Sequence, residues 1–359
     1  MDWPSHGSNP KNLYEAIALP MPEEIIDFSA NINPLGPLSE LKEKWKDMFL
    51  RIIDYPDPHA TSLRKGIAEI EQVDPQSILI GNGGAELISL ITRLLAGKNV
   101  LIVQPAFSEY EKSCRVNECN ISYHQLEDPF WQLDIDQLLP KLEEVDALFL
   151  CNPNNPTGVQ YRFEMVLALI DACKETQCQI ILDEAFYDML EDYRSFIPYI
   201  KKFENLIIIR SMTKMYAVPG LRLGYMVAHP EIIHRVEKFQ THWSVNSLAL
   251  AAGEVFIQNT SFLHETRQYI SEERRKLFAF FSKEGYRFSP TEVNFYLFRD
   301  PDCEDQLPLF RHLLEQGIVP RHTFNFSGLD GNWLRFAIKS SCENNELIKV
   351  LKKWKQPHT

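Results

Sequence analysis

The spacing of apolar and polar positions is most regular between about residues 60 and 228. Short, nearly continuous runs of β-branched and apolar residues occur at 77–81, 99–105, 121–126, 147–153, 179–185, 206–211 and 223–228. Stretches with helical spacing separate them, for example at 85–97 and 163–177. Strands that are buried on both faces have continuous rather than alternating apolar runs. The pattern therefore predicts an α/β fold, with a mostly parallel, mixed sheet flanked by helices.

The two ends of the chain have a different pattern. Residues 1–40 are rich in Pro, Asn and Ser and have little periodicity, which is typical of an arm laid over another part of the protein. Long helical patterns follow the predicted sheet, then strand patterns at 294–300 and 333–339 and a terminal helix. We expect a large α/β domain at 41–245 and a smaller α+β domain formed by 1–40 and 246–359.

Composition narrows the class of protein. The 359 residues are 45% hydrophobic and 24% charged, with a formal net charge of −12, so nucleic acid and anionic membranes are not expected as partners. No apolar stretch is long enough to span a bilayer, and the first residues lack a signal-peptide pattern. Seven cysteines without CxxC spacing indicate a reduced compartment and no metal site. We expect a cytoplasmic protein that holds anionic ligands with a few local arginines.

The residues after each predicted strand are the first candidates for a site, because open α/β sheets bind ligands at the carboxyl ends of their strands. "GNGGAE" at 81–86 opens a helix, so its N–H groups could hold a phosphate. It lacks the third glycine of a dinucleotide fingerprint and the lysine of a P-loop, and a tight turn without a ligand is an equally good interpretation. "CNPNNPTGV" at 151–159 predicts a rigid turn with three amide side chains, more than a turn requires.

Two charged residues stand at the ends of buried strands. Asp183 follows the apolar part of "IILDEAF", and a buried carboxylate needs a partner. An arginine, a helix N-terminus or a protonated ring nitrogen of a cofactor could be that partner. Lys214 follows "LIIIRS" among small and apolar residues. Most lysines are solvated surface charges, but an enclosed amine loses its proton more readily and can attack a carbonyl carbon.

These motifs, in this order, resemble those of a known family. "CNPNNPTG", "DEAF", "RSMTK" and "PGLRLGY" are similar to motifs of the pyridoxal-phosphate enzymes of the aspartate aminotransferase superfamily, fold type I. Within it, "DFSANINPLG", "YPD" and "WSVN" resemble histidinol-phosphate aminotransferases and, more narrowly, L-threonine-O-3-phosphate decarboxylases. Ser8 stands where a glycine is usual and Met212 where leucine is common; neither departure touches the expected chemistry.

The resemblance implies pyridoxal 5′-phosphate as the cofactor and a role for each matching residue. Lys214 would bind the cofactor covalently, and Asp183 would hold the proton on its ring nitrogen, which makes the ring an electron sink. Asn155 would donate a hydrogen bond to the ring oxygen O3′, and Phe107 would stack on the ring. The cofactor phosphate would be bound by Gly83, Gly84, Ala85, Ser211, Thr213 and Arg222. Tyr55 would reach this phosphate from a second subunit, which implies a homodimer.

Position 186 departs from the usual pattern. Aminotransferases of this superfamily usually have a tyrosine there that donates to O3′, whereas this chain has Phe186. The decarboxylase-like relatives tolerate the phenylalanine. With phenylalanine at this position, O3′ loses one hydrogen-bond donor and depends more on Asn155. The neighbouring Tyr187 faces the other way if strand-like alternation continues.

The implied substrate is a small phosphorylated amino acid with two anionic ends. Arginine suits such groups because its fork binds oxyanions bidentately. From the residues alone, a structural ion pair is an equally good interpretation of Arg335, and a solvated side chain is the better one for His6. The resemblance assigns substrate binding to His6, Gly7, Asn31, Asn155, Arg321 and Arg335.

Two reactions stay open at this point. A substrate carboxylate held perpendicular to the cofactor ring leaves as CO2, whereas one held in the ring plane leaves the α-proton to depart. The first hypothesis is decarboxylation of L-threonine O-3-phosphate to (R)-1-amino-2-propanol O-2-phosphate in cobalamin biosynthesis. The alternative is an aminotransferase for histidinol phosphate or another amino acid. The presence of Lys214, Asp183, Asn155 and Arg222 disfavours a catalytically idle regulator, and the broken glycine fingerprint disfavours a nicotinamide dehydrogenase.

Overall fold

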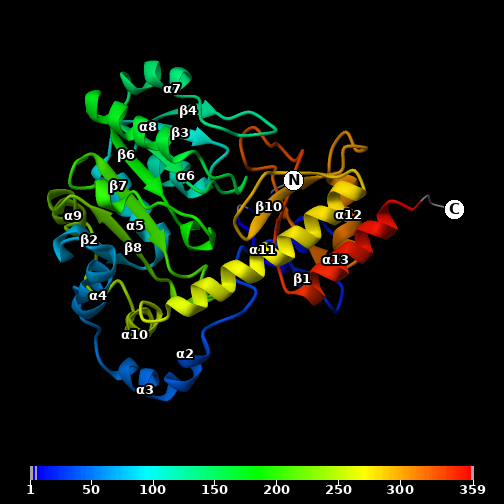
Figure 1. The fold of residues 1–359 in the computed structure, drawn as a ribbon, viewed down its shortest axis with the longest axis horizontal. Helices are drawn as coiled ribbons and strands as arrows, with labels where there is room; N and C mark the ends of the chain where they lie inside the picture. Colours follow the sequence, from blue (N-terminus) through cyan, green and yellow to red (C-terminus); the bar gives the residue numbers. More distant parts are fainter. Residues whose placement is uncertain (1–2, 5, 357–359) are drawn as a thin grey trace.

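The computed structural model describes residues 3–4 and 6–356, which form two lobes joined by a long helix (Figure 1). The larger lobe is built on a seven-stranded sheet of order β2-β8-β7-β6-β5-β3-β4. All neighbours are parallel except β8, which runs antiparallel to both β2 and β7. This confirms the predicted mixed, mostly parallel sheet. The strands are β2 (Ile78–Gly81), β3 (Asn99–Gln104), β4 (Asn120–Gln125), β5 (Ala147–Cys151), β6 (Gln179–Asp183), β7 (Leu206–Ser211) and β8 (Gly224–Ala228).

Successive residues of the central strands pack into two different cores. In β6, Ile180 and Leu182 belong to one core and Ile181 to the other. Side chains alternate across a strand, so a central strand covered by helices on both faces must be apolar at every position. One core includes residues of α4 (Thr61–Glu71), α7 (Ile135–Leu142), α8 (Phe163–Glu175) and α10 (Ser247–Phe256); the other includes residues of α5 (Gly83–Leu94), α6 (Ser108–Val116) and α9 (Pro230–Glu237).

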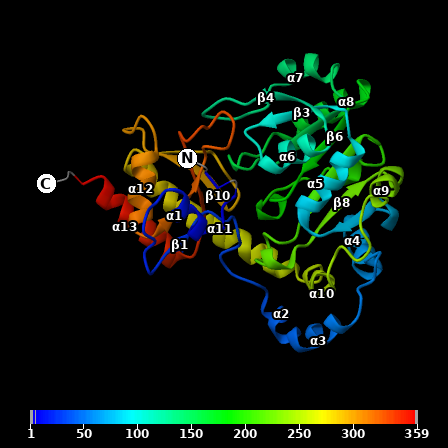
Figure 2. The same ribbon diagram turned by 180° about the vertical axis from the view of Figure 1, so that it is seen from behind.

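The smaller lobe combines the two ends of the chain (Figures 1 and 2). Its four-stranded antiparallel sheet has the order β12-β13-β10-β9, and β1 pairs in parallel with β11. The strands are β1 (Ile26–Asp27), β9 (Arg287–Phe288), β10 (Phe295–Arg299), β11 (Ile318–Val319), β12 (Arg321–His322) and β13 (Leu334–Ala337). The helices are α1 (Pro10–Ala16), α11 (Thr260–Lys283), α12 (Leu307–Glu315) and α13 (Ser341–Trp354). Helix α1 lies in the segment for which no regular element was expected.

Short elements complete the chain. Helices α2 (Ser39–Glu43) and α3 (Trp45–Leu50) and the 3-10 helix η1 (Arg51–Ile53) connect the lobes on one side of the molecule (Figure 2). Four further 3-10 helices are η2 (Pro75–Ser77), η3 (Tyr187–Met189), η4 (Ile197–Tyr199) and η5 (Pro219–Leu221). Residues 1–2, 5 and 357–359 of the predicted small domain lie outside the described residues, and the domain limits at 41 and 245 stay a prediction. Across residues 3–4 and 6–356, no helix has both the length and the apolar character that a membrane crossing requires.

Candidate active site

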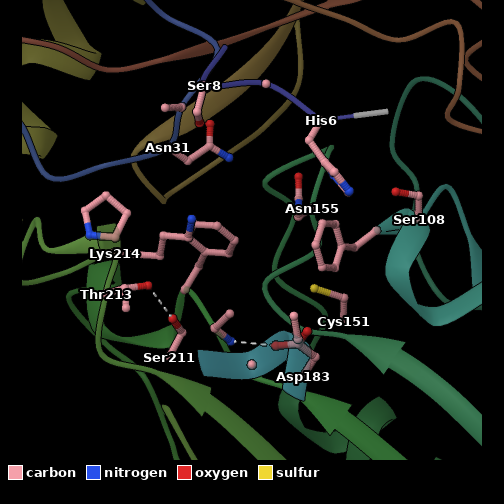
Figure 3. Close-up of a pocket in the computed structure, with 18 of the residues that line it drawn as sticks. His6, Ser8, Asn31, Ser108, Cys151, Asn155, Asp183, Ser211, Thr213 and Lys214 are labelled. Atoms are coloured by element: carbon pink, nitrogen blue, oxygen red, sulfur yellow. Dashed lines mark hydrogen bonds between the residues drawn. The ribbon is translucent and has the colours of Figure 1, made fainter. Parts of the chain in front are cut away.

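A cavity of about 390 Å³ opens where β5, β6 and β7 end and the N-terminal arm crosses from the smaller lobe. Figure 3 shows His6, Ser8 and Asn31 of the arm on the side of the cavity opposite Asp183. Residues far apart in the sequence therefore line one space. Of the residues predicted from the sequence, the cavity is lined by His6, Gly7, Asn31, Gly84, Ala85, Phe107, Asn155, Asp183, Ser211, Thr213, Lys214, Arg222, Arg321 and Arg335.

Two predicted residues do not line this cavity. Gly83 lies directly behind Arg222, and its φ of +78° belongs to the left-handed region that favours glycine. A Cβ there would stand 2.6 Å from Arg222 Nη2, so the backbone favours glycine and the guanidinium could approach this closely only if no side chain were present. Tyr55 is 82% exposed and packs on Trp243, with ring centroids 4.8 Å apart. Within one chain, Tyr55 is therefore outside the site.

One end of the cavity has the donors that a phosphate group needs. Helix α5 begins at Gly83, so the N–H groups of its first turn have no partner within the helix and point out of its positive end. The hydroxyls of Ser211 and Thr213 lie 3.0 Å apart, and Arg222 adds a guanidinium. This donor set fits a bound phosphate.

Asp183 is the last residue of β6 and is buried under the cavity. Its Oδ2 accepts a hydrogen bond of 2.5 Å from the Tyr110 hydroxyl, and its Oδ1 accepts one of 2.9 Å from the Ala185 N–H. Burial raises the pKa of Asp183, whereas these donors and the Lys214 amine act to lower it. A carboxylate held in this way fits a positively charged partner inside the cavity.

Lys214 lies in the turn that follows β7, and its side chain enters the cavity beside Thr213 (Figure 3). Burial and the nearby charges of Arg335 and Arg222 lower its pKa to about 8, although Asp183 acts to raise it. An ordinary lysine has a pKa near 10.4, so a much larger fraction of this amine is uncharged at neutral pH. The structure thus places Lys214 in the cavity with a lowered pKa, which suits an amine that attacks a carbonyl carbon.

Asn155 and Arg335 form a pair at the cavity wall. Arg335 donates from Nη1 to Asn155 Oδ1 at 2.5 Å and from Nη2 to Ser29 O at 2.7 Å. Because the Asn155 oxygen is engaged, its amide N–H groups can donate into the cavity. The other two asparagines of the motif have structural contacts: Asn152 Oδ1 accepts from Tyr161 N, and Asn154 Nδ2 donates to Pro105 O.

The arm adds polar groups on the opposite side. His6 Nε2 lies 2.9 Å from Glu109 Oε1 of α6, and the Ser8 N–H donates to Ser29 Oγ at 2.8 Å. Among the residues that the structure describes, Asn31 Oδ1 and Arg335 Nε are buried without a hydrogen-bond partner. Such orphaned groups are costly unless a ligand pairs with them.

Several lining residues were missed from the sequence: Ser8, Ser29, Ser108, Tyr110, Cys151 and Phe326. Tyr110 stands three residues after Phe107, on the first turn of α6, so helical spacing could have placed both on one side. Cys151 pairs in register with Asp183 across β5 and β6, a contact that needs the strand order. Ser8 and Ser29 of the arm gave no local signal, because their place at the cavity depends on how the two lobes pack.

Comparison with known proteins shows which family the chain is similar to. Residues 23–353 match the family model described as aminotransferase class I and II. A threonine-phosphate decarboxylase of Salmonella typhimurium is 36% identical over 97% of this chain and 96% of its own. A histidinol-phosphate aminotransferase of Caldanaerobacter subterraneus is 32% identical over 90% of this chain and 92% of its own. The solved histidinol-phosphate aminotransferase of Clostridium acetobutylicum is 31% identical, with a TM-score of 0.86 over 91% of this chain and 98% of its own.

The chain belongs to the aminotransferase class I and II family, the fold type I enzymes that depend on pyridoxal 5′-phosphate. The residues of the cavity fit this cofactor at three of its functional groups. The first turn of α5 with Ser211, Thr213 and Arg222 suits the phosphate, Asp183 suits the ring nitrogen, and Lys214 suits the aldehyde carbon.

Phe186 lines the cavity, as the position of its motif implies, and packs edge-on against Phe295 with ring centroids 4.7 Å apart. The Tyr187 hydroxyl instead lies 3.5 Å from that of Tyr225, and the Arg210 guanidinium lies 3.5 Å from the Tyr187 ring centroid. Tyr187 therefore does not supply the donor that phenylalanine lacks.

Replacing Phe186 with tyrosine is expected to lower the pH at which the visible band of the bound cofactor titrates. A hydroxyl that donates to the ring oxygen favours the ionised form of that oxygen. The proton whose loss changes the visible band therefore leaves at a lower pH. Tyr187→Phe is the matched control, because its hydroxyl faces away from the cavity. If the new hydroxyl cannot reach the ring, the buried and unpaired group should instead destabilise the fold by about 1–3 kcal/mol. An unchanged titration together with an unchanged melting curve would show that position 186 does not face the cofactor.

Proposed function

We propose that this enzyme decarboxylates L-threonine O-3-phosphate to (R)-1-amino-2-propanol O-2-phosphate, a step of cobalamin biosynthesis, and does so in the cytoplasm. The observation that carries the proposal is the pair Arg321 and Arg335 in one cavity. Burial lowers the pKa of Arg321 to about 10; burial and the nearby Arg321 charge lower that of Arg335 to about 9, so both stay charged at neutral pH. Two buried guanidinium groups suit a small substrate with two anionic ends.

The charges around the cavity favour the binding of strongly anionic ligands. Asp183 is the one carboxylate among the described lining residues, whereas the cationic residues that line the same cavity are Lys214, Arg222, Arg321 and Arg335. When bound, pyridoxal 5′-phosphate withdraws electrons from the bond that breaks at the substrate's α-carbon. The residues of the chain would bind and orient the substrate: Arg335 is held by Asn155 and Ser29 at one wall, and Arg321 donates from Nη2 to Asn325 Oδ1.

The resemblance to the Salmonella protein at 36% identity supports decarboxylation. An aminotransferase for histidinol phosphate remains the second candidate, because relatives with that name are 31–32% identical over most of the chain. Histidinol phosphate has a phosphate but no carboxylate, so two buried guanidinium groups fit it less fully than they fit threonine phosphate.

One assay separates the two reactions. The protein is incubated separately with L-threonine O-3-phosphate and with histidinol phosphate, each with and without 2-oxoglutarate, and both CO2 and glutamate are measured. Decarboxylation predicts CO2 release that does not need 2-oxoglutarate. L-threonine without the phosphate is the substrate control, and Lys214→Ala is the protein control. Glutamate formed from histidinol phosphate, with no CO2 from threonine phosphate, would contradict the proposal in favour of the aminotransferase.

We also propose that the enzyme acts as a homodimer. Exposed apolar and aromatic side chains stand close together in the sequence at the end of α3, in η1 and just after it: Phe49, Leu50, Ile52, Ile53 and Tyr55. Trp243 packs against Tyr55. An apolar surface of this kind is typical of an interface. A second copy seated there could bring its Tyr55 to the cofactor phosphate of the first.

Tyr55→Phe is expected to weaken retention of the cofactor without separating the subunits, because it removes one hydroxyl and keeps the ring. The release of cofactor on dilution and the sedimentation of the holoenzyme are the two measurements. Tyr123→Phe, at another partly exposed tyrosine on the edge strand β4, is the control. A stable and fully active monomer would contradict the proposed dimer.

A further inference from the structure

The turn that holds Lys214 has buried carbonyl groups that bond outside the turn. Residues 212–217 follow β7 without forming a regular helix, and Met215 is fully buried. The Lys214 carbonyl accepts a hydrogen bond of 3.1 Å from the Asn33 N–H. The Met215 carbonyl accepts one of 2.7 Å from Asn33 Nδ2. A buried carbonyl without a donor is costly, so these two bonds help to fix the path of the turn.

Asn33 also contacts a third segment of the chain, the helix α11. Its Nδ2 also lies 2.7 Å from Thr266 Oγ1 of α11, and its Oδ1 accepts from the Leu35 N–H at 3.0 Å. Asn33 and Thr266 are both buried, at 3% and 0% exposure. Side-chain and backbone groups of one residue thus join three segments: the arm after β1, the Lys214 turn and the helix that runs from the larger lobe into the smaller one (Figure 1).

We propose that Asn33 is a positioning residue for Lys214: it fixes the lysine-bearing turn against α11 and so sets where the amine stands in the cavity. The same segment of chain lines the cavity two to four residues earlier, at Ser29, Ala30 and Asn31. The arm would therefore place cavity groups and the nucleophile together. The inference concerns the attachment of the cofactor and holds for either reaction considered above.

The contacts predict a specific result when the amide is lost. Asn33→Leu keeps the branched shape and removes every side-chain hydrogen bond without adding a charge; Asn33→Ala removes the same bonds and the volume as well. A turn that is no longer tied at Met215 can move, and the amine becomes more accessible to water. The charges that face Lys214 from its surroundings are Asp183, Arg222 and Arg335, and these stay in place.

Two measurements on the full-length protein test the proposal. The first is the rate at which the holoenzyme loses its cofactor on dilution, which is expected to rise about tenfold in both variants, as the loss of one well-made buried hydrogen bond would give. The second is the pH dependence of Lys214 acetylation by acetic anhydride in protein freed of cofactor, followed by peptide mapping. The pH at which half of the Lys214 amine is reactive (the Lys214 midpoint) is expected to move upward from about 8 toward the value of an ordinary lysine.

The control is another buried asparagine with a similar set of bonds. Asn344 Nδ2 donates to Glu273 Oε2 at 2.9 Å and to Lys339 O at 2.8 Å, and Asn344 does not line the cavity. Asn344→Ala should lower the melting temperature without changing cofactor release or the Lys214 midpoint. If the Asn33 variants match either the wild type or Asn344→Ala in both measurements, Asn33 has only a structural role and the proposal is overturned.

A milder change covers the case in which the Asn33 variants do not fold. Thr266→Val keeps the shape of the side chain and removes only the partner on α11, so both carbonyl bonds to the turn remain. We expect a smaller change of the same sign in both measurements. Wild-type cofactor release and a wild-type Lys214 midpoint in Thr266→Val would show that α11 does not anchor Asn33, which would overturn the proposal.

Discussion

Replacing Lys214 with alanine is expected to abolish both turnover and covalent attachment of the cofactor, while the fold stays intact. With a pKa of about 8, roughly one amine in ten is uncharged at pH 7, against roughly one in 2500 for an ordinary lysine. No other amine lines the cavity among the described residues, so nothing replaces it. Reduction of the wild-type holoenzyme with borohydride and peptide mapping should place the cofactor on Lys214.

The pH dependence of attachment provides a second check on the same residue. The uncharged amine is the nucleophile, so the rate of attachment to cofactor-free protein should rise with pH and level off above about pH 8. An unburied lysine would still be gaining reactivity near pH 10. A label on another lysine, or retained turnover in Lys214→Ala, would show that the assignment is wrong.

Asp183→Asn is expected to lower the rate by about a thousandfold or more, which corresponds to about 4 kcal/mol in the barrier. Asparagine keeps the shape and can still accept from the Tyr110 hydroxyl, but it has no charge with which to hold a proton on the ring nitrogen. The measurement is kcat/KM, with a melting curve to show that the protein is folded.

The next residue supplies a matched control. Glu184 is also buried, but its Oε2 accepts from Arg210 Nε at 2.8 Å, away from the cavity. Glu184→Gln makes the same chemical change and weakens a buried ion pair, so it should reduce stability more than rate. Near-normal kcat/KM in Asp183→Asn, or an equal loss of rate in Glu184→Gln, would contradict a specific role for the Asp183 charge.

The motifs around the sheet could be predicted because they are local. Each is a buried strand followed by a turn, and the carboxyl ends of parallel strands meet at one edge of the sheet. Asp183 and Ser211 end β6 and β7, Asn155 and Lys214 stand in the turns after β5 and β7, and the structure brings all four into one cavity. Their roles came from the resemblance, since spacing alone left ordinary structural interpretations open for each.

Position 187 shows where a local argument reaches its limit. Strand alternation was the reason for expecting Tyr187 to face away from the cavity, yet residues 187–189 form a 3-10 helix. The side chain does point away, because its ring packs against the Arg210 guanidinium and its hydroxyl approaches Tyr225. The packing of a buried charge, rather than strand periodicity, decided its direction.

The sequence by itself determined the alternation of strands and helices, the candidate residues at the strand ends and the family to which their motifs belong. These follow from periodicity and from residues that are neighbours in the chain. Only the tertiary structure decided the contacts between distant segments: Tyr110 with Asp183, Arg335 with Asn155, and Asn33 with Met215 and Thr266. The partners in these pairs stand 73, 180, 182 and 233 residues apart. No local pattern encodes such pairs, because they depend on how the arm and the two lobes pack around the cavity.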